Sequence, residues 1–316
     1  MKLLSIVQII YLLLVILFGA YVRMTGSGAG CGQNWPLCNG EFIPQDPAIH
    51  TMIEYTHRMS SGLCLPYAFL LLGLFWRRRS RASMQLALVW QSLTFFFLLL
   101  EGALGAGLVL LEHVAQNQSA YRAITMGLHL VNTFALMATA FGVVICHVPC
   151  LQRDRQKWVP MEWTVVFAGV VLLLFSGVSG AVTALGDTVF PPSSAFEAMT
   201  LAMQAASHLF VKLRVFHPFI AVFVGFALIY IAAWLLERNW ASVSQYRLIL
   251  GLVVMQWMVG ILNVSFHAPD YLQLLHLAIA QLLWLSYVSI PLGVGYARIA
   301  RSDWRRPPAQ FVGQRT

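Results

Sequence analysis

Four histidines occupy related places in the sequence, and their spacing suggests metal chemistry. Each lies near the start of a long apolar segment, two in the front half of the chain and two in the back half: His57, His129, His217 and His276. Two histidines that face each other from neighbouring helices can bind the iron of a heme between them. A zinc or copper site would need further ligands, which the apolar segments do not offer. We therefore predict two heme sites, His57 with His129 and His217 with His276.

The segments that carry these histidines are long enough to cross a membrane. The chain has 316 residues, 59% of them hydrophobic and 10% charged, and its mean hydropathy is +0.72. Eight segments reach the roughly 20 apolar residues of a membrane-spanning helix, without the alternation of barrel strands. They lie at about 3–22, 58–76, 86–111, 123–148, 163–185, 215–236, 248–266 and 271–297. The predicted fold is an all-α integral membrane protein with eight transmembrane helices.

The basic residues predict how these helices are oriented. If eight helices alternate in direction, 15 of the 20 lysines and arginines fall on the side of the two termini. The positive-inside rule then places both termini in the cytoplasm and all four histidines towards the outer surface. This distribution accounts for the net charge of +8 without a nucleic-acid partner. The first span lacks a cleavage pattern and no Arg- and Ser-rich leader precedes it, so we expect a bacterial plasma membrane.

The order of features suggests an internal duplication. Residues 19–22 (Gly-Ala-Tyr-Val) end the first span and residues 180–183 (Gly-Ala-Val-Thr) end the fifth. In each half a polar loop comes next, and a histidine then opens the following span. The fourth span of each half again carries a histidine near its start. We predict two parallel four-helix units, residues 1–157 and 158–316.

The two units differ in the charged residues beside their histidines. Glu54 lies three residues before His57 and therefore on the same helix face, where it could accept or donate a proton. A solvated charge at the start of a helix is the alternative explanation. Arg58 in one half and Arg214 in the other would suit heme propionates. Because the back half has no glutamate at this spacing, we expect a reactive front half and a permanent cofactor in the back half.

Two further features have open roles. Glu101 lies inside the third span and matches Gln256 of the seventh span in the repeat. It could relay protons, bond a substrate group, or act as a protonated structural donor between helices. Cys31 and Cys38 share the first outer loop, where a disulfide would close a short loop. A redox-active dithiol is the second interpretation of this pair.

With these features together, the sequence resembles the heme A synthase family over nearly its whole length. A cysteine loop followed by a Glu-x-x-His-Arg block is the most specific part of the resemblance. The matching residues are 19–23, 26–31, 35–40, 54–62 and 274–278. Two departures are the Phe216-His217-Pro218 run, where the family usually has His-Arg, and a second outer loop without a cysteine pair.

The resemblance implies a fold and a set of ligands. It implies eight helices in two pseudo-symmetric four-helix bundles, with the substrate heme O in the N-terminal bundle and a b heme in the C-terminal bundle. His57 and His129 would flank the substrate with Glu54 beside it, and His217 and His276 would bind the b heme. Cys31 and Cys38 match the members that carry a disulfide there.

The resemblance also implies a reaction. Members of the family are membrane oxidoreductases that convert the C8 methyl group of heme O to a formyl group, by two hydroxylations and loss of water, giving heme A for terminal oxidases. The competing prediction is a diheme b-type cytochrome for electron transfer; Glu54 and the unequal halves favour the enzyme. Expected partners are membrane lipid, heme O and the prenyltransferase that makes it. A homo-oligomer is compatible with the sequence, which does not identify the electron acceptor.

Overall fold

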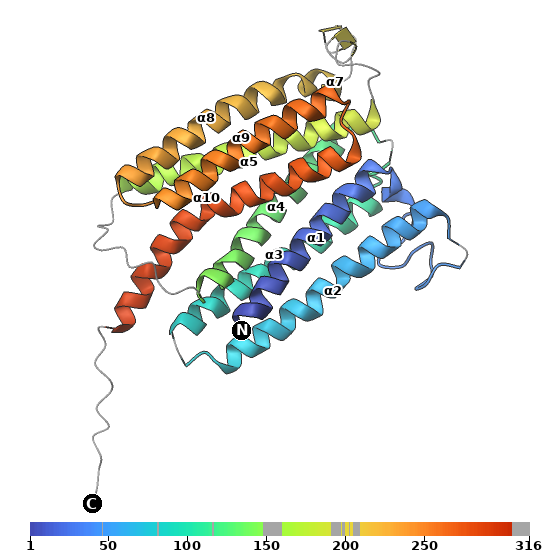
Figure 1. The fold of residues 1–316 in the computed structure, drawn as a ribbon. Helices are drawn as coiled ribbons and strands as arrows, with labels where there is room; N and C mark the ends of the chain where they lie inside the picture. The colour runs from blue at the N-terminus through green and yellow to red at the C-terminus, as the bar shows by residue number, and fades with distance from the viewer. Residues whose placement is uncertain are drawn as a thin grey trace, which may run out of the picture.

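The protein is built from long helices that run nearly parallel to one another (Figure 1). The computed structural model describes residues 1–45, 47–80, 82–115, 117–147, 160–190, 197, 200–201, 203–204 and 209–304. Its long helices are α1 (Lys2–Met24), α2 (Ile49–Arg77), α3 (Ala82–Leu110), α4 (Ala120–Ile145), α5 (Pro160–Val189), α8 (Phe216–Glu237), α9 (Val243–Ser265) and α10 (Asp270–Trp304). A short 3-10 helix, η1 (Ser27–Ala29), follows α1, and the short α7 (Leu209–Arg214) precedes α8.

Eight spans in the described residues are long and apolar enough to cross a membrane, which confirms the predicted fold class. Many large apolar side chains on their outer faces are exposed, among them Phe69, Phe96, Phe219 and Phe226. Such an apolar exterior suits helices surrounded by lipid acyl chains, where no water competes for the surface. The chain is therefore a multi-pass membrane protein.

The helices form two groups along the chain. Helices α1 to α4 pack against one another, and α5, α8, α9 and α10 pack against one another. The groups meet mainly where α4 contacts α5 and α10 and where α1 contacts α10. Over their apolar stretches α4 is 56% buried and α10 39% buried, against 17% for α1, so α4 and α10 are the central helices. The pseudo-symmetry of the two groups stays a prediction.

Aromatic side chains hold the two groups together at their centre. The Trp284 indole N–H donates to the Phe134 carbonyl at 2.8 Å, and the two rings lie 5.1 Å apart. Within the back group, the fully buried Tyr287 of α10 donates its hydroxyl to the Val166 carbonyl of α5 at 3.0 Å. Close approach at Gly169 makes this possible, because a Cβ there would lie against the Tyr287 hydroxyl. Small residues that allow such contacts are a usual device of membrane helix packing.

Arg23, at the end of α1, also joins the two groups. Its guanidinium donates to the Ala184 carbonyl at 2.7 Å and to the Thr188 hydroxyl at 2.5 Å, both on α5. It donates to Gln273 Oε1 on α10 at 3.0 Å. In the predicted repeat, Ala184 is the residue of the back half that corresponds to Arg23. Alanine has no side-chain donor, so the back half makes no equivalent hydrogen bond to the front half from this position.

The helix ends differ from the sequence-based spans. Helix α2 begins at Ile49 and not near residue 58, and α5 covers Pro160–Val189 and not 163–185. The prediction that His57 opens its span is therefore wrong, because the helix begins about two turns earlier. The extension lengthens the helix at the end that carries the Cys31–Cys38 loop, which we call the disulfide end.

Candidate functional site

The four predicted histidines lie at similar depths in four different helices. His57 is on α2, His129 on α4, His217 on α8 and His276 on α10. Each lies roughly two turns after the first residue of its apolar span. Because all four spans begin at the disulfide end, the imidazoles occupy the same half of the bundle's thickness.

The structure brings the histidines together in the two predicted pairs. His57 lies within electrostatic range of His129 and of Glu101. His217 lies within electrostatic range of His276. The members of each pair come from different helices of one group, which is the arrangement that can bind one iron from two sides.

A glycine on a neighbouring helix lies against each imidazole. A Cβ added to Gly180 would lie 3.0 Å from His217 Cε1, and one added to Gly19 would lie 3.1 Å from His57 Cε1. The corresponding distances are 3.4 Å from Gly260 to His276 and 4.0 Å from Gly105 to His129. Gly19 and Gly180 mark the repeat in the sequence, but no sequence signal connected any of the four glycines with the histidines.

The ring nitrogens are suited to a further ligand. His57 Nδ1 and His276 Nδ1 are buried and have no hydrogen-bond partner among the described residues. His129 Nδ1 is buried 3.4 Å from Glu101 Oε1, which leaves Nε2 for another contact. His217 Nδ1 lies 2.9 Å from Ser179 Oγ, which leaves Nε2 for another contact. Because buried polar atoms without partners are costly, bound iron would remove a penalty at such imidazoles. The histidine pairs therefore fit heme ligation, with His57 and His129 available in one group and His217 and His276 in the other.

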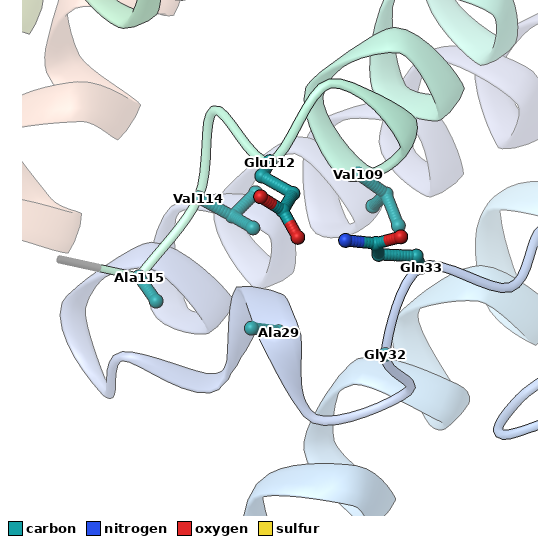
Figure 2. A pocket seen from close by; sticks show the side chains of 7 residues that line it. All are labelled: Ala29, Gly32, Gln33, Val109, Glu112, Val114 and Ala115. Carbon is teal, nitrogen blue, oxygen red and sulfur yellow. The ribbon is translucent and has the colours of Figure 1, made fainter. Parts of the chain in front are cut away.

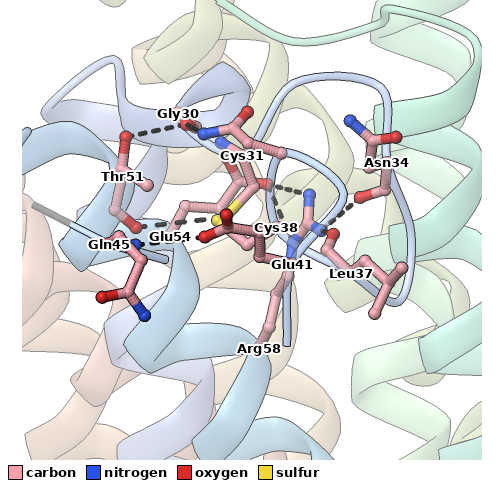
Figure 3. The surroundings of a disulfide bond; sticks show 11 residues. Gly30, Cys31, Asn34, Leu37, Cys38, Glu41, Gln45, Thr51, Glu54 and Arg58 are labelled. Atoms are coloured by element: carbon pink, nitrogen blue, oxygen red, sulfur yellow. Dashed lines mark hydrogen bonds and ion pairs between the residues drawn. A yellow bond between two sulfur atoms is a disulfide. The ribbon is translucent and has the colours of Figure 1, made fainter. Parts of the chain in front are cut away.

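Glu54 and Arg58 are bound to the disulfide loop (Figure 3). Glu54 is only 3% exposed; its Oε2 accepts from the Cys31 backbone N–H at 2.8 Å, and its Oε1 accepts from Arg58 Nη2 at 2.5 Å. Arg58 Nη1 donates to the Asn34 and Leu37 carbonyls at 2.5 and 2.7 Å. Glu54 is thus a buried, paired carboxylate one turn before His57, and the Arg58 guanidinium binds both Glu54 and the loop.

The predicted disulfide is confirmed. Cys31 and Cys38 are bonded, and both are buried, with exposed fractions of 0% and 2%. The Thr51 hydroxyl donates to the Gly30 carbonyl at 2.8 Å, which adds a second tie between this loop and α2. The loop therefore forms a closed unit on the first turns of the helix that carries His57.

Arg214 lies at the disulfide end of the back half. Its Nε is 2.8 Å from Asp187 Oδ1, and its Nη2 donates to the Gly186 and Phe190 carbonyls at 2.9 and 2.8 Å. Nη1 is buried and has no partner among the described residues. Arg214 therefore keeps one donor for an anionic group such as the predicted propionate.

Glu101 is a carboxylate that lies against a predicted ligand. Its Oε1 lies 3.4 Å from His129 Nδ1 and 2.5 Å from Thr133 Oγ1, and its Oε2 accepts from Asn132 Nδ2 at 2.5 Å. Asn132 and Thr133 follow His129 by three and four residues on α4, a spacing that places them on the same helix face as His129. Neither Asn132 nor Thr133 was among the predicted site residues.

A small cavity lies apart from the histidines. It has a volume of about 270 Å³ and lies between the loop after η1 and the α3–α4 connection (Figure 2). Its lining consists of Ala29, Gly32, Gln33, Val109, Glu112, Val114 and Ala115. None of these is a predicted site residue.

Comparison with known proteins identifies the family. The sequence profile of COX15-CtaA, described as cytochrome oxidase assembly protein, matches residues 2–288. The chain belongs to this family. Among COX15-CtaA relatives, the heme A synthase of Alkalihalophilus pseudofirmus is 28% identical over 302 residues, covering 92% of this chain and 96% of that protein. The resemblance to heme A synthases is thereby confirmed.

Two further relatives are similar to this chain over only part of their own length. A heme A synthase of Bacillus cereus is 39% identical over 133 residues, covering 42% of this chain and 40% of that protein. A protoheme IX farnesyltransferase of Thermus thermophilus is 42% identical over 280 residues. That match covers 87% of this chain and 45% of the relative, so the chain spans less than half of the relative's length.

Proposed function

We propose that the chain is a heme A synthase, which oxidises the C8 methyl group of heme O to a formyl group. The observation that carries this proposal is the pair of unequal histidine sites in a member of the COX15-CtaA family. The front pair has two glutamates close by, Glu54 one turn before His57 and Glu101 against His129. The back pair has neutral neighbours, Ser179 and Gln256.

The proposed reaction is a four-electron oxidation. In net terms, a methyl group and one water become a formyl group, four protons and four electrons, and an electron acceptor takes the electrons. The bound heme supplies the redox chemistry, while the protein supplies ligands, orientation and proton transfer. His57 and His129 hold the substrate heme, and Glu54 accepts or donates protons near its reacting edge.

The back half holds a permanent cofactor in this proposal. His217 and His276 bind the iron of a b heme, and Arg214 Nη1 binds a propionate. Asp187 and the two carbonyls that hold the Arg214 guanidinium orient this donor. A neutral environment around both histidines suits a cofactor that stays bound and does not react.

Heme O would come from a farnesyltransferase that acts on protoheme. The Thermus relative with that name contains a region similar to this chain within a polypeptide more than twice as long as the match. This supports a partnership between the two activities, in which the farnesylated heme passes from one membrane protein to the other.

The proposed location is a bacterial plasma membrane with both termini in the cytoplasm. The excess of lysine and arginine on the side of the termini supports this orientation. Reporter fusions after residues 80, 157 and 240 should read cytoplasmic, and fusions near 40, 115, 195 and 268 should read external. A cytoplasmic signal near residue 40 would overturn the orientation of all four histidines.

Pigment extraction tests the activity. The full chain is expressed with and without a heme O-producing farnesyltransferase, and the hemes of the purified protein are identified by mass. We expect b heme in both cases and, with the farnesyltransferase, heme A or its hydroxylated intermediate. Two b hemes in both cases, without heme A, would favour the diheme cytochrome.

A further inference from the structure

Glu101 and Gln256 occupy corresponding positions in the two halves, and each contacts a predicted ligand. Glu101 is on α3, and its Oε1 lies 3.4 Å from His129 Nδ1 on α4. Gln256 is on α9, and its Nε2 lies 3.0 Å from His276 Nε2 on α10. The same pair of positions thus joins a carboxylate to a histidine in the front half and a neutral amide to a histidine in the back half.

The carboxylate is fixed in its position by α4 itself. Asn132 Nδ2 donates to Oε2 and also to the Phe97 carbonyl at 2.9 Å, so it links α3 and α4. Thr133 Oγ1 contacts Oε1, the oxygen that faces His129. The Glu101 carboxylate is therefore aimed at the imidazole by two residues of the same helix face.

We infer that Glu101 is a positioning residue that makes His129 a more electron-rich iron ligand than His276. When His129 Nε2 binds iron, the neutral ring carries its proton on Nδ1, the nitrogen that faces Glu101. A carboxylate that attracts this proton fixes the ring and raises the basicity of the ligand. Gln256 is neutral and cannot act in this way, whichever nitrogen of His276 binds iron. The inference rests on the proposed heme ligation.

A difference in reduction potential follows from this charge difference. A more basic axial ligand stabilises the oxidised iron, so the heme in the front half has the lower potential for a given heme type. The separation of 3.4 Å is longer than an ordinary hydrogen bond, and a small turn of the imidazole upon ligation would shorten it. The two sites thus differ in potential because of one residue type at matched positions.

Reciprocal substitutions test the inference. Glu101→Gln gives the front half the side chain of the back half, and Gln256→Glu does the reverse. The full chain is purified with its hemes, and each heme is followed by potentiometric titration and by ferric low-spin electron paramagnetic resonance. We expect Glu101→Gln to raise the potential of the front heme alone and Gln256→Glu to lower that of the back heme alone. Loss of the carboxylate should weaken front-heme binding by about 10- to 100-fold.

Thr133→Val provides a test of sign. It removes the hydroxyl that competes for Glu101 Oε1 and keeps the side-chain shape, so the front-heme potential should fall, opposite to the Glu101→Gln shift. If Glu101→Gln loses the front heme, this variant decides the question. If Glu101→Gln and Thr133→Val shift the potential in the same direction, or neither shifts it, Glu101 only ties α3 to α4 and the inference fails. A wild-type protein that holds no front heme even when it is expressed with a heme O-producing farnesyltransferase would instead defeat the proposed function.

Discussion

The front and back histidine pairs each lie on the second and fourth long helices of their group, but the polar groups beside them differ in charge. In the front half two carboxylates are built in, and each is held by specific donors: Glu54 by Cys31 and Arg58, and Glu101 by Asn132. In the back half a hydroxyl and an amide take the places next to the histidines. In the proposed function, a few polar differences near the imidazoles would distinguish a reactive site from a storage site on one helical framework.

Histidine removal should give the largest effect and the clearest separation of the two halves. His217→Ala or His276→Ala should abolish binding of the permanent b heme, because one axial ligand is lost. His57→Ala or His129→Ala should abolish heme A formation and leave the b heme in place. Heme content measured by mass and by reduced-minus-oxidised spectra checks both. Loss of the b heme in the front-half variants alone would reverse the assignment.

Replacement of Glu54 sharpens the comparison inside the front half. Glu54→Gln keeps the size of the side chain but removes its charge, and we expect heme O or a hydroxylated intermediate to accumulate. General acid–base groups contribute about 100- to 10,000-fold to rates, so heme A yield should fall by that order. The exposed Glu41→Gln is the matched control. A yield close to wild type would show that Glu54 serves only to hold the loop and Arg58.

Opening the disulfide should disturb the front half and spare the back half. The double variant Cys31→Ser with Cys38→Ser removes a cross-link worth about 2 to 3 kcal/mol and loosens the loop that contacts Glu54 and Arg58. We expect a lower thermal midpoint and less heme A, with unchanged b heme. Cys64→Ala removes a free thiol from α2 and serves as the control. Equal loss of both hemes would contradict a local role for the loop.

Alanine at the four glycines should produce the smallest and most graded effects. At Gly180 and Gly19 the new Cβ would push the imidazole of His217 or His57, at a cost of about 1 to 3 kcal/mol. Gly260→Ala should have a weaker effect and Gly105→Ala the weakest, in the order of their distances. Heme spectra of each half give the measure. Gly62→Ala and Gly251→Ala meet open space and should leave both hemes unchanged; an equal effect there would contradict the contact.

The sequence predicted the number of helices well and their ends poorly. Runs of about 20 apolar residues give a strong signal, so all eight spans were found. The polar residues Glu54 and Arg58 shifted the predicted start of α2 to residue 58, since neither their ion pair nor their hydrogen bonds to the loop after η1 can be read from the sequence. Similarly, α5 continues past the predicted end at 185 because Asp187 pairs with Arg214.

The sequence also indicated the histidine pairs but not their neighbours. Repeated features in the two halves identified His57, His129, His217 and His276 without any knowledge of their contacts. The contact between Glu101 and His129 joins different helices, so no local spacing could report it. Contacts of this kind depend on how helices rotate against each other, which a single sequence does not specify.

The bridge made by Arg23 has a consequence for the order in which the chain is completed. Arg23 is synthesised before its partners Ala184, Thr188 and Gln273, which follow it by 161 to 250 residues. Until α5 and α10 are inserted, this guanidinium must keep water as its partner, because leaving it buried and unpaired would be costly. A chain that ends after α4 would therefore keep the Arg23 guanidinium hydrated at the edge of the first four helices, without the three partners that it has in the full fold.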